Sequence, residues 1–302
     1  METKRKGICA RNWDCLLAYG LILPSLIVFG IFMFYPLFYT IYLSFFDWNM
    51  IKPIKTFVGW KNYIALFQDP LTYTVLKNTL AYLGILLVLN CVAPYVLAFI
   101  LSFVIKRGQS FYKSAFFLPS VISLVVGSIL YLWILNPISG PAAIIAKLLG
   151  IPLPVWSKTP GLVIVILSLI TTWKVFGYNF IVIFGGVAGV PREVIEAARI
   201  DNVPLYRIFF DIVLPMSGAT GIYIFIMTIV QGLQYVFTPI KVITQGGPDN
   251  ASSNLIYHVY QEGFNLYHTG YASAFAIVTM ALFIVLLIFE FKYVEKGIYY
   301  EK

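Results

Sequence analysis

Charged residues are scarce in this sequence. Aspartate, glutamate, lysine and arginine make up 11% of the 302 residues, whereas hydrophobic residues make up 60%. A soluble domain has about 25% charged residues, and a water-facing surface with so few charges would expose large apolar patches. The composition therefore excludes an ordinary soluble protein, and it excludes a disordered chain because such chains are poor in apolar residues. Lipid is the expected solvent for most of the chain.

Cysteine and histidine are also few, and they show no ligand or redox pattern. The three cysteines, Cys9, Cys15 and Cys91, form no C-x-x-C pair, and His258 and His268 lack metal-ligand spacing. We expect neither a disulfide framework nor a metal site. The sequence also lacks the G-x-x-x-x-G-K-S/T phosphate loop, so we expect the chain neither to hydrolyse ATP nor to bind a cofactor of its own.

Six long stretches of the chain are almost free of charge. A bilayer core of about 30 Å needs roughly 20 apolar helical residues, and each stretch is long enough for one crossing. A lipid-facing barrel would instead show short segments of alternating polarity. The sequence therefore predicts an all-α integral membrane protein with one transmembrane domain, residues 1–302. The predicted spans are residues 15–38, 77–105, 111–135, 161–188, 216–239 and 270–291.

Lysine and arginine lie mainly on one side of these spans, which carries 13 of them against 7 on the other side. The positive-inside rule then places both termini in the cytoplasm. The net charge of +8 indicates topology and contact with anionic lipid head groups, not nucleic-acid binding, since no basic cluster with stacking aromatics lies outside the spans. The basic side consists of residues 1–14, the turn with Lys106, Arg107 and Lys113, the loop 189–215, and the tail from Lys292.

The loop 189–215 has the pattern of two short helices joined by a turn. Pro191 suits a first helical position, and Glu196 can pair with Arg192 and Arg199 at i−4 and i+3. An apolar face makes this helix amphipathic. The residues of that face are Val194, Ile195 and Ala198.

The turn and the second helix of the loop follow directly. Asn202 can adopt the left-handed conformation that ends a helix, and Pro204 can open the next one. Phe209, Phe210 and Val213 give the second helix an apolar side. Such a pair of helices would fit a groove on a partner protein; an ordinary amphipathic connector is the alternative.

Short motifs of this loop resemble a known family. Glu196-Ala197-Ala198, Asp201 and Leu214-Pro215 are similar to the cytoplasmic signature of permease subunits of binding-protein-dependent ABC importers. Fragments along nearly the whole chain resemble the sugar-importer branch, in the maltose and glycerol-phosphate form without the large periplasmic insertion. These fragments are Leu23-Pro24-Ser25, Gly59-Trp60-Lys61-Asn62-Tyr63, Thr244-Gln245-Gly246-Gly247-Pro248 and Gly270-Tyr271-Ala272-Ser273-Ala274.

The resemblance implies a type I ABC importer permease in a bacterial cytoplasmic membrane. A second homologous permease would complete the pore, an extracellular solute-binding protein would deliver a carbohydrate, and two cytoplasmic ATPase subunits would bind ATP and magnesium. The loop would dock on an ATPase, with Glu196 as its main contact. Asn202 replaces the usual glycine of the family, although asparagine also tolerates positive φ. The implied docking residues are Glu196, Ala197, Ala198, Arg199, Asp201 and Asn202.

Two polar stripes at helical spacing indicate where the cargo passes. Lys174 lies in the middle of the fourth span, where a lysine costs about 2.5–3.5 kcal/mol to insert, and Thr171 and Tyr178 share its face. The resemblance places these three positions at the substrate site of sugar permeases. The fifth-span stripe consists of Thr228, Gln231, Gln234, Tyr235 and Thr238.

The interpretation of these stripes has alternatives. Hydroxyls, amides and rings around a water-filled cavity would suit a sugar, whereas the same residues can serve interhelical hydrogen bonding. For Lys174, one possibility is an acidic cargo, and the other is a carbonyl or carboxylate of a partner helix. A gradient-driven transporter would usually carry an intramembrane carboxylate, but the spans hold only Glu290 at an edge. No catalytic cluster is present either, so we expect a transport subunit that is not an enzyme.

Overall fold

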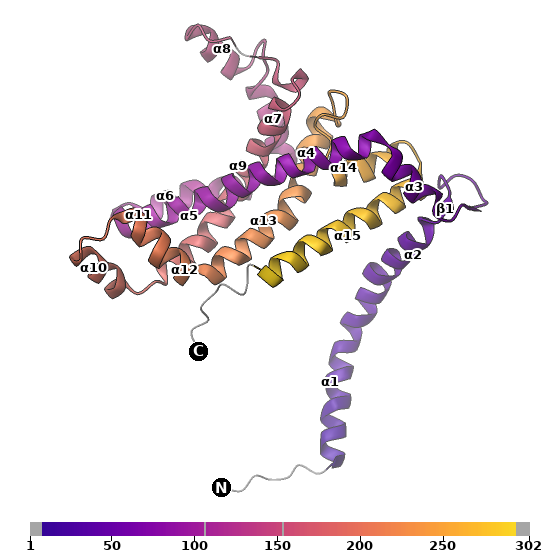
Figure 1. The fold of residues 1–302 in the computed structure, drawn as a ribbon, viewed down its shortest axis with the longest axis horizontal. Coiled ribbons are helices and arrows are strands. Elements are labelled where there is room, and N and C mark those ends of the chain that lie inside the picture. The colour runs from indigo at the N-terminus through magenta and orange to yellow at the C-terminus, as the bar shows by residue number, and fades with distance from the viewer. Residues whose placement is uncertain (1–7, 106, 153, 294–302) are drawn as a thin grey trace. The chain divides into compact units, whose positions relative to one another are not determined.

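The computed structural model describes residues 8–105, 107–152 and 154–293, and nearly all of its regular structure is helical (Figure 1). One antiparallel pair of two-residue strands, β1 Phe46–Asp47 and β2 Thr56–Phe57, is the exception among the described residues. Lys106, residues 1–7 and residues 294–302, which contribute to the predicted orientation, lie outside the described residues. The orientation stays a prediction.

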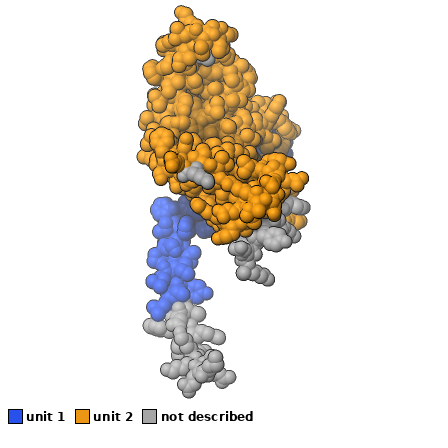
Figure 2. Space-filling model, turned by 90° about the vertical axis from the view of Figure 1, so that its left-hand side faces the viewer, with its two compact units in different colours: residues 1–66, 262–277 blue, residues 67–261, 278–302 orange. Residues whose placement is uncertain are grey.

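The chain packs into two compact units, shown separately coloured in Figure 2. One contains the described residues up to Leu66 together with Glu262–Ile277, and the other contains those of Phe67–Gln261 and Val278–Lys302. The helices that lie wholly or partly in the first unit are α1 Ile8–Phe29, η1 Gly30–Phe34, α2 Tyr35–Leu43, α3 Lys61–Gln68, η8 Gln261–Asn265 and α15 Thr269–Tyr293.

The second unit holds most of the helices. Its first half contains α4 Pro70–Leu87, η2 Val88–Val92, α5 Ala93–Phe99, η3 Ile100–Val104, α6 Gln109–Phe117, η4 Leu118–Val121, α7 Leu124–Ile134, α8 Pro141–Leu148 and η5 Trp156–Lys158. Its second half contains α9 Leu162–Ala188, α10 Arg192–Ile200, α11 Leu205–Arg207, η6 Ile208–Val213, α12 Leu214–Met216, α13 Gly218–Pro239, η7 Ile240–Thr244 and α14 Leu255–Tyr260.

Five helical segments of the described chain are long and apolar enough to cross a membrane, or six if one bent pair counts as a span. The boundaries differ from the predicted ones mainly at the second span, which begins at Pro70 because the Asp69 side chain accepts from the backbone N–H of Leu71 at 2.8 Å and caps the helix. The five segments are Leu17–Leu43, Pro70–Val104, Leu162–Ala188, Gly218–Thr244 and Thr269–Phe289.

The bent pair is the predicted third span, 111–135. Gln109–Val121 and Leu124–Ile134 meet at an angle of 98°, because Ile122 and Ser123 are extended, with ψ of 140° and 136°. Pro119 lies just before this break, where its ring and its missing N–H interrupt the helical ladder. A hydropathy pattern alone reports the apolar length but not the break. The number of six spans stays a prediction.

Proline also explains several π-helical segments. Pro36, Pro94 and Pro215 each stand two residues after the end of a π-helical segment, namely η1, η2 and η6. A proline donates no N–H to the carbonyl four residues earlier and its ring crowds that carbonyl, so the preceding turn widens. Pro94 lies inside the second span, and the wider turn η2 is the form that its disturbance of the helix takes.

Sequence motifs of the first unit have structural roles. The Asn62 side chain donates through Nδ2 to the backbone oxygens of Ser44 at 2.8 Å and Phe46 at 3.1 Å. The backbone N–H of Gly270 donates to Trp48 O at 3.2 Å, and a Cβ at Gly270 would overlap Phe46 O. Asn62 and Gly270 therefore hold the chain that leaves the first span.

Helix α9 organises the second unit by packing against α4, α5, α6, α7 and α13. One hydrophobic cluster surrounds its first half, with Leu167 and Ile170 fully buried. A second cluster surrounds its later turns and includes Phe180 and Ile183. The loop 189–215 contributes to this second cluster, so it is packed onto the spans and not detached from them.

Candidate functional site

The loop 189–215 folds as two short helices joined by a turn, as its pattern predicts. Helix α10 begins at Arg192, with Pro191 as the residue just before the helix and not at its first position. Asn202 has a φ of 55°, which confirms the left-handed turn. Pro204 is the residue just before the second helix, which begins at Leu205.

Helix α10 is fixed to the spans by one apolar side and one side-chain bond. Ile195 and Ala198 are 3% and 8% exposed within the second hydrophobic cluster, whereas Val194 is exposed, so the buried face is narrower than predicted. Arg199 donates from Nη2 to the backbone oxygen of Phe103 at 2.5 Å. Phe103 lies in the last turn of η3, where carbonyls lack partners within the helix.

Four of the predicted docking residues in α10 and the turn after it are exposed. Glu196 and Ala197 are exposed, as are Asp201 and Asn202 at the turn. The predicted pairs of Glu196 with Arg192 and Arg199 are not formed among the described residues. Glu196 and Arg192 instead border a polar cleft of 410 Å³, whose further lining residues are Ser102, Phe103, Ile105, Gln109, Ile195 and Arg199.

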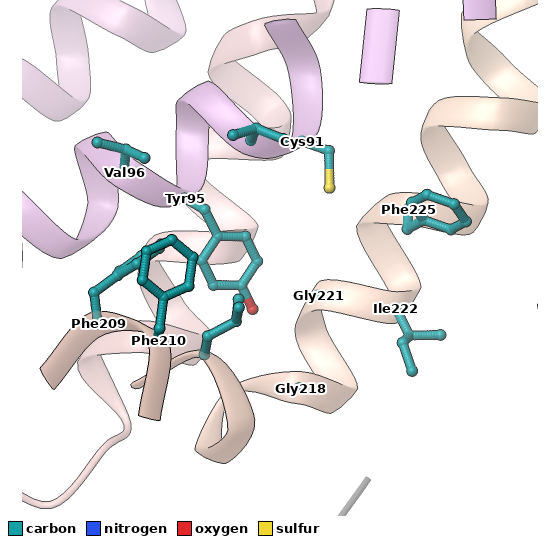
Figure 3. Close-up of a pocket in the computed structure, with 11 residues that line it drawn as sticks. Cys91, Tyr95, Val96, Phe209, Phe210, Gly218, Gly221, Ile222 and Phe225 are labelled. Atoms are coloured by element: carbon teal, nitrogen blue, oxygen red, sulfur yellow. The ribbon is translucent and has the colours of Figure 1, made fainter. Parts of the chain in front are cut away.

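The second helix of the loop joins the spans at an apolar cavity of 480 Å³ (Figure 3). Val213 is buried, Phe209 packs its ring 5.2 Å from that of Phe99, and Phe210 is exposed, so the predicted apolar side is only partly covered. Tyr95 lies beside Phe209 and Phe210 in Figure 3, opposite Ile222 and Phe225. Sequence reasoning did not predict this cavity.

The tyrosine hydroxyl at this cavity is already bonded. Tyr95 donates from its hydroxyl to Ser217 O at 2.9 Å, and Figure 3 shows its oxygen beside Gly221, where a Cβ would lie 2.9 Å from it. The remaining lining is almost entirely apolar, with Cys91, Val92, Val96, Leu214 and Gly218 completing it. A hydroxyl-rich cargo would find few partners here, so this cavity is a poor carbohydrate site.

A smaller cavity of 200 Å³ lies between the predicted polar stripes. Four of the eight side chains in the two predicted stripes line it: Lys174 and Tyr178 from α9, and Gln231 and Tyr235 from α13. The two stripes therefore face each other. The cavity combines two tyrosine rings, an amide and an ammonium group, which can bind polar groups and flat sugar faces.

The other four members of the stripes, Thr238 among them, do not line the cavity. Thr171 is fully buried and donates from Oγ1 to Leu167 O at 2.9 Å, within its own helix. Gln234 is exposed and does not line the cavity. Thr228 is buried and accepts at 3.3 Å from Asn179 Nδ2, so at this position the alternative of interhelical hydrogen bonding is correct.

Sequence reasoning missed the third wall of the cavity. Phe117 and Ser120 line it from the broken span, and the sequence pattern of that span gave no sign that they do. Lys174 donates from Nζ to Ile122 O at 2.7 Å and also to Ser120 O. The partner of the intramembrane lysine is thus a pair of backbone carbonyls. The described residues contain no cluster of three histidine, cysteine, aspartate or glutamate side chains that could hold a metal ion.

Comparisons with known proteins identify the family. Residues 77–299 match the family model of the binding-protein-dependent transport system inner membrane component. A probable ABC transporter permease protein, YurN, of Bacillus subtilis is 30% identical over 289 residues, covering 95% of this chain and 98% of that protein. The sn-glycerol-3-phosphate transport system permease protein UgpA of Brucella abortus is 32% identical over 296 residues, covering 94% and 97%.

Solved structures agree on the fold. A chain of a bacterial ABC transporter involved in the import of the acidic polysaccharide alginate superposes with a TM-score of 0.81 at 22% identity, covering 95% of this chain and 99% of that one. This likeness confirms the predicted permease fold of a type I importer. The protein is therefore a multi-pass membrane protein of the family of binding-protein-dependent transport system inner membrane components, a non-catalytic permease subunit of an ABC transporter.

Proposed function

We propose that this chain forms half of the path by which a carbohydrate crosses a bacterial cytoplasmic membrane, with both termini on the cytoplasmic side. The observation that carries the proposal is the cavity between α9 and α13. Side chains distant in sequence, Lys174 and Tyr178 on one helix and Gln231 and Tyr235 on the other, converge there. Their chemistry suits a solute that offers hydroxyl groups and flat apolar faces.

The energy would come from separate ATPase subunits that bind ATP and magnesium. In support, the outward side chains of Glu196, Ala197, Asp201 and Asn202 form an exposed surface at the end of α10. Ala198 and Arg199 have a different role, because they contact the spans and orient the helix. We assign docking on one of the two ATPase subunits to the first four residues and positioning to the other two.

A second permease subunit and an extracellular solute-binding protein complete the proposed complex. The most apolar part of the first span, within Leu17–Leu43, has none of its residues buried, so lipid or another subunit must cover it. A related structure shows a bacterial alginate ABC transporter in complex with an alginate pentasaccharide-bound periplasmic protein, with a TM-score of 0.78. That assembly supports delivery of the cargo by an extracellular solute-binding protein, and we assign the second permease as a homologous subunit that forms a heterodimer with this chain.

An acidic carbohydrate is the second candidate cargo. The names of two relatives favour it, since alginate is described as an acidic polysaccharide and glycerol 3-phosphate carries a phosphate. The cavity contains one ammonium group, that of Lys174, but this group already donates to two carbonyls. The uncharged side chains that line the cavity, Tyr178, Gln231 and Tyr235, suit a neutral or an acidic carbohydrate.

Reconstitution tests the proposal. The chain would be assembled in proteoliposomes with candidate ATPase, partner permease and solute-binding protein, and ATP hydrolysis would be measured with a panel of neutral and acidic oligosaccharides. We expect the loaded binding protein to stimulate hydrolysis and cargo to accumulate inside. Accumulation that needs an ion gradient and no ATPase would overturn the proposal in favour of a secondary transporter.

A further inference from the structure

The break in the third candidate span leaves backbone carbonyls without helical partners. The 3-10 turn η4 ends at Val121, Ile122 and Ser123 are extended, and α7 begins at Leu124. The oxygens of Ser120 and Ile122 therefore lie where the ladder of i to i+4 bonds is interrupted. In a membrane each such group must find a donor from the protein, because lipid offers none.

Lys174 supplies that donor to both carbonyls. Its Nζ donates to Ile122 O at 2.7 Å and to Ser120 O, and Ser120 Oγ donates in return to Lys174 O at 3.0 Å. Three hydrogen bonds thus connect one residue of α9 with the turn before the break and with the break itself. A positive charge beside carbonyl ends is also favourable, because those oxygens carry partial negative charge.

Neighbouring residues of α9 contact the same broken span before and after the break. A Cβ at Gly177 would overlap Phe116 O, so α6 crosses α9 closely at that point. On the other side, the Trp173 ring reaches the position where a Cβ of Gly127 would lie, at 2.9 Å, and stacks edge-on with Tyr131 at 5.3 Å. One edge of α9 therefore follows the bend, with Lys174 at its apex.

We propose that Lys174 is a positioning residue that holds the bend between α6 and α7, and not the counter-charge of an anionic cargo. The bend presents Phe117 and Ser120 to the cavity of 200 Å³, so the lysine shapes the wall that faces the cargo. Two of the three donors of its ammonium group are occupied by carbonyls. The role of this cavity in transport rests on the proposed function, whereas the bend itself does not.

Distance measurement between two labels tests the bend directly. Spin labels at Ser114→Cys and Ile129→Cys, both exposed and on opposite sides of the break, would be placed in the full complex after Cys9, Cys15 and Cys91 are replaced by serine. We expect Lys174→Arg to keep the distance distribution and Lys174→Met to shift and broaden it. Thr171→Val is the matched control, because its hydroxyl is bonded only within α9, and it should change nothing.

Transport separates the two roles of the lysine. If Lys174 positions the wall, Lys174→Met should lower maximal transport of a neutral and an acidic oligosaccharide alike, by roughly tenfold, the order expected when a buried carbonyl loses its donor. A counter-charge would instead raise the KM for the acidic cargo alone. An unchanged label distance together with a loss confined to the acidic cargo would overturn the proposal.

Two further outcomes keep the experiment decisive. If Lys174→Met does not assemble, Lys174→Ala, whose short side chain has no donor, takes its place; a distance distribution identical to that of the unaltered chain would then contradict the proposal. The label distance is measured without cargo. If no oligosaccharide stimulates the ATPase, the proposed function fails while the result on the bend still stands.

Discussion

Arg199 donates to the backbone oxygen of Phe103, with 2.5 Å between Nη2 and the oxygen. Arg199 lies in the last turn of α10, and Phe103 lies in the last turn of the span Pro70–Val104. The bond therefore joins the proposed ATPase-docking helix to a transmembrane span. A displacement of α10 acts on that span through this bond as well as through the packing of Ile195.

Replacing Arg199 by alanine should weaken this connection without preventing docking. Because Glu196 and Ala197 are unchanged, we expect the ATPase to copurify with the variant, while cargo moved per ATP hydrolysed falls several-fold. Parallel assays of cargo and phosphate in proteoliposomes measure that ratio. Arg192→Ala is the control, since Arg192 borders the same cleft but donates to no backbone carbonyl among the described residues. Equal losses in the two variants would contradict a specific role of Arg199.

Glu196 should contribute to docking and not to the stability of this chain. Its side chain is exposed and forms no ion pair among the described residues, so Glu196→Gln removes no contact within the subunit. We expect an unchanged melting temperature of the isolated permease pair and weaker copurification of the ATPase. Glu193, exposed in the first turn of the same helix, provides the matched substitution Glu193→Gln. Normal ATPase binding by Glu196→Gln would refute the assignment.

Asn202 should be replaceable by glycine but not by a β-branched residue. Glycine adopts a φ of 55°, the value at this position, without a steric clash. A residue with an ordinary side chain destabilises the turn there by about 1–2 kcal/mol. We expect Asn202→Val to speed hydrogen exchange at the end of α10 and Asn202→Gly to leave it unchanged. Asp201→Val is the control, because Asp201 has an ordinary φ of −75°. Equal exchange in all three variants would show that the turn carries no strain.

The loop was the most predictable part of the molecule because its determinants are local. Pro191, Asn202 and Pro204 act on their own backbone, so the turn and both helix starts follow from residue type. The third span was less predictable, since its apolar length says nothing of the break at Ile122–Ser123. The ion pairs expected for Glu196 depend on arginine side chains that can also bond to other groups. Arg199 donates instead to the backbone oxygen of Phe103, which lies in a span distant in sequence.

Gln231 and Gln234 should differ in their effect on cargo. Gln231 lines the cavity between α9 and α13, whereas Gln234 is exposed outside it. We expect Gln231→Ala to weaken binding of the transported oligosaccharide to the complex by roughly fivefold to tenfold, the order of one lost hydrogen bond. Gln234→Ala should bind normally in the same titration. Equal weakening by both variants would argue against this cavity as the cargo site.

Helical spacing predicted the cavity only in part, for a geometric reason. It places Thr171, Lys174 and Tyr178 along one side of α9, but it cannot say where the neighbouring helices lie. Because α9 is surrounded by other helices, positions only slightly apart around its axis can face either the cavity or the core. Thr171 faces the core. The partners of Lys174 required the break in the third span, which no periodicity reveals.

Two glycines of α9 test the close crossing that accompanies the bend. A Cβ at Gly177 would overlap Phe116 O, while a Cβ at Gly185 would meet no atom within 4 Å. Gly177→Ala must therefore push α6 away, and overpacking of this kind costs about 1–3 kcal/mol. We expect a lower melting temperature of the purified complex and an altered distance between labels at Ser114→Cys and Ile129→Cys. Gly185→Ala should be neutral or slightly stabilising, because alanine is the better helix former. If Gly177→Ala is as well tolerated as Gly185→Ala, the two helices do not cross as closely as Phe116 and Gly177 indicate, and the bend has room to move independently of α9.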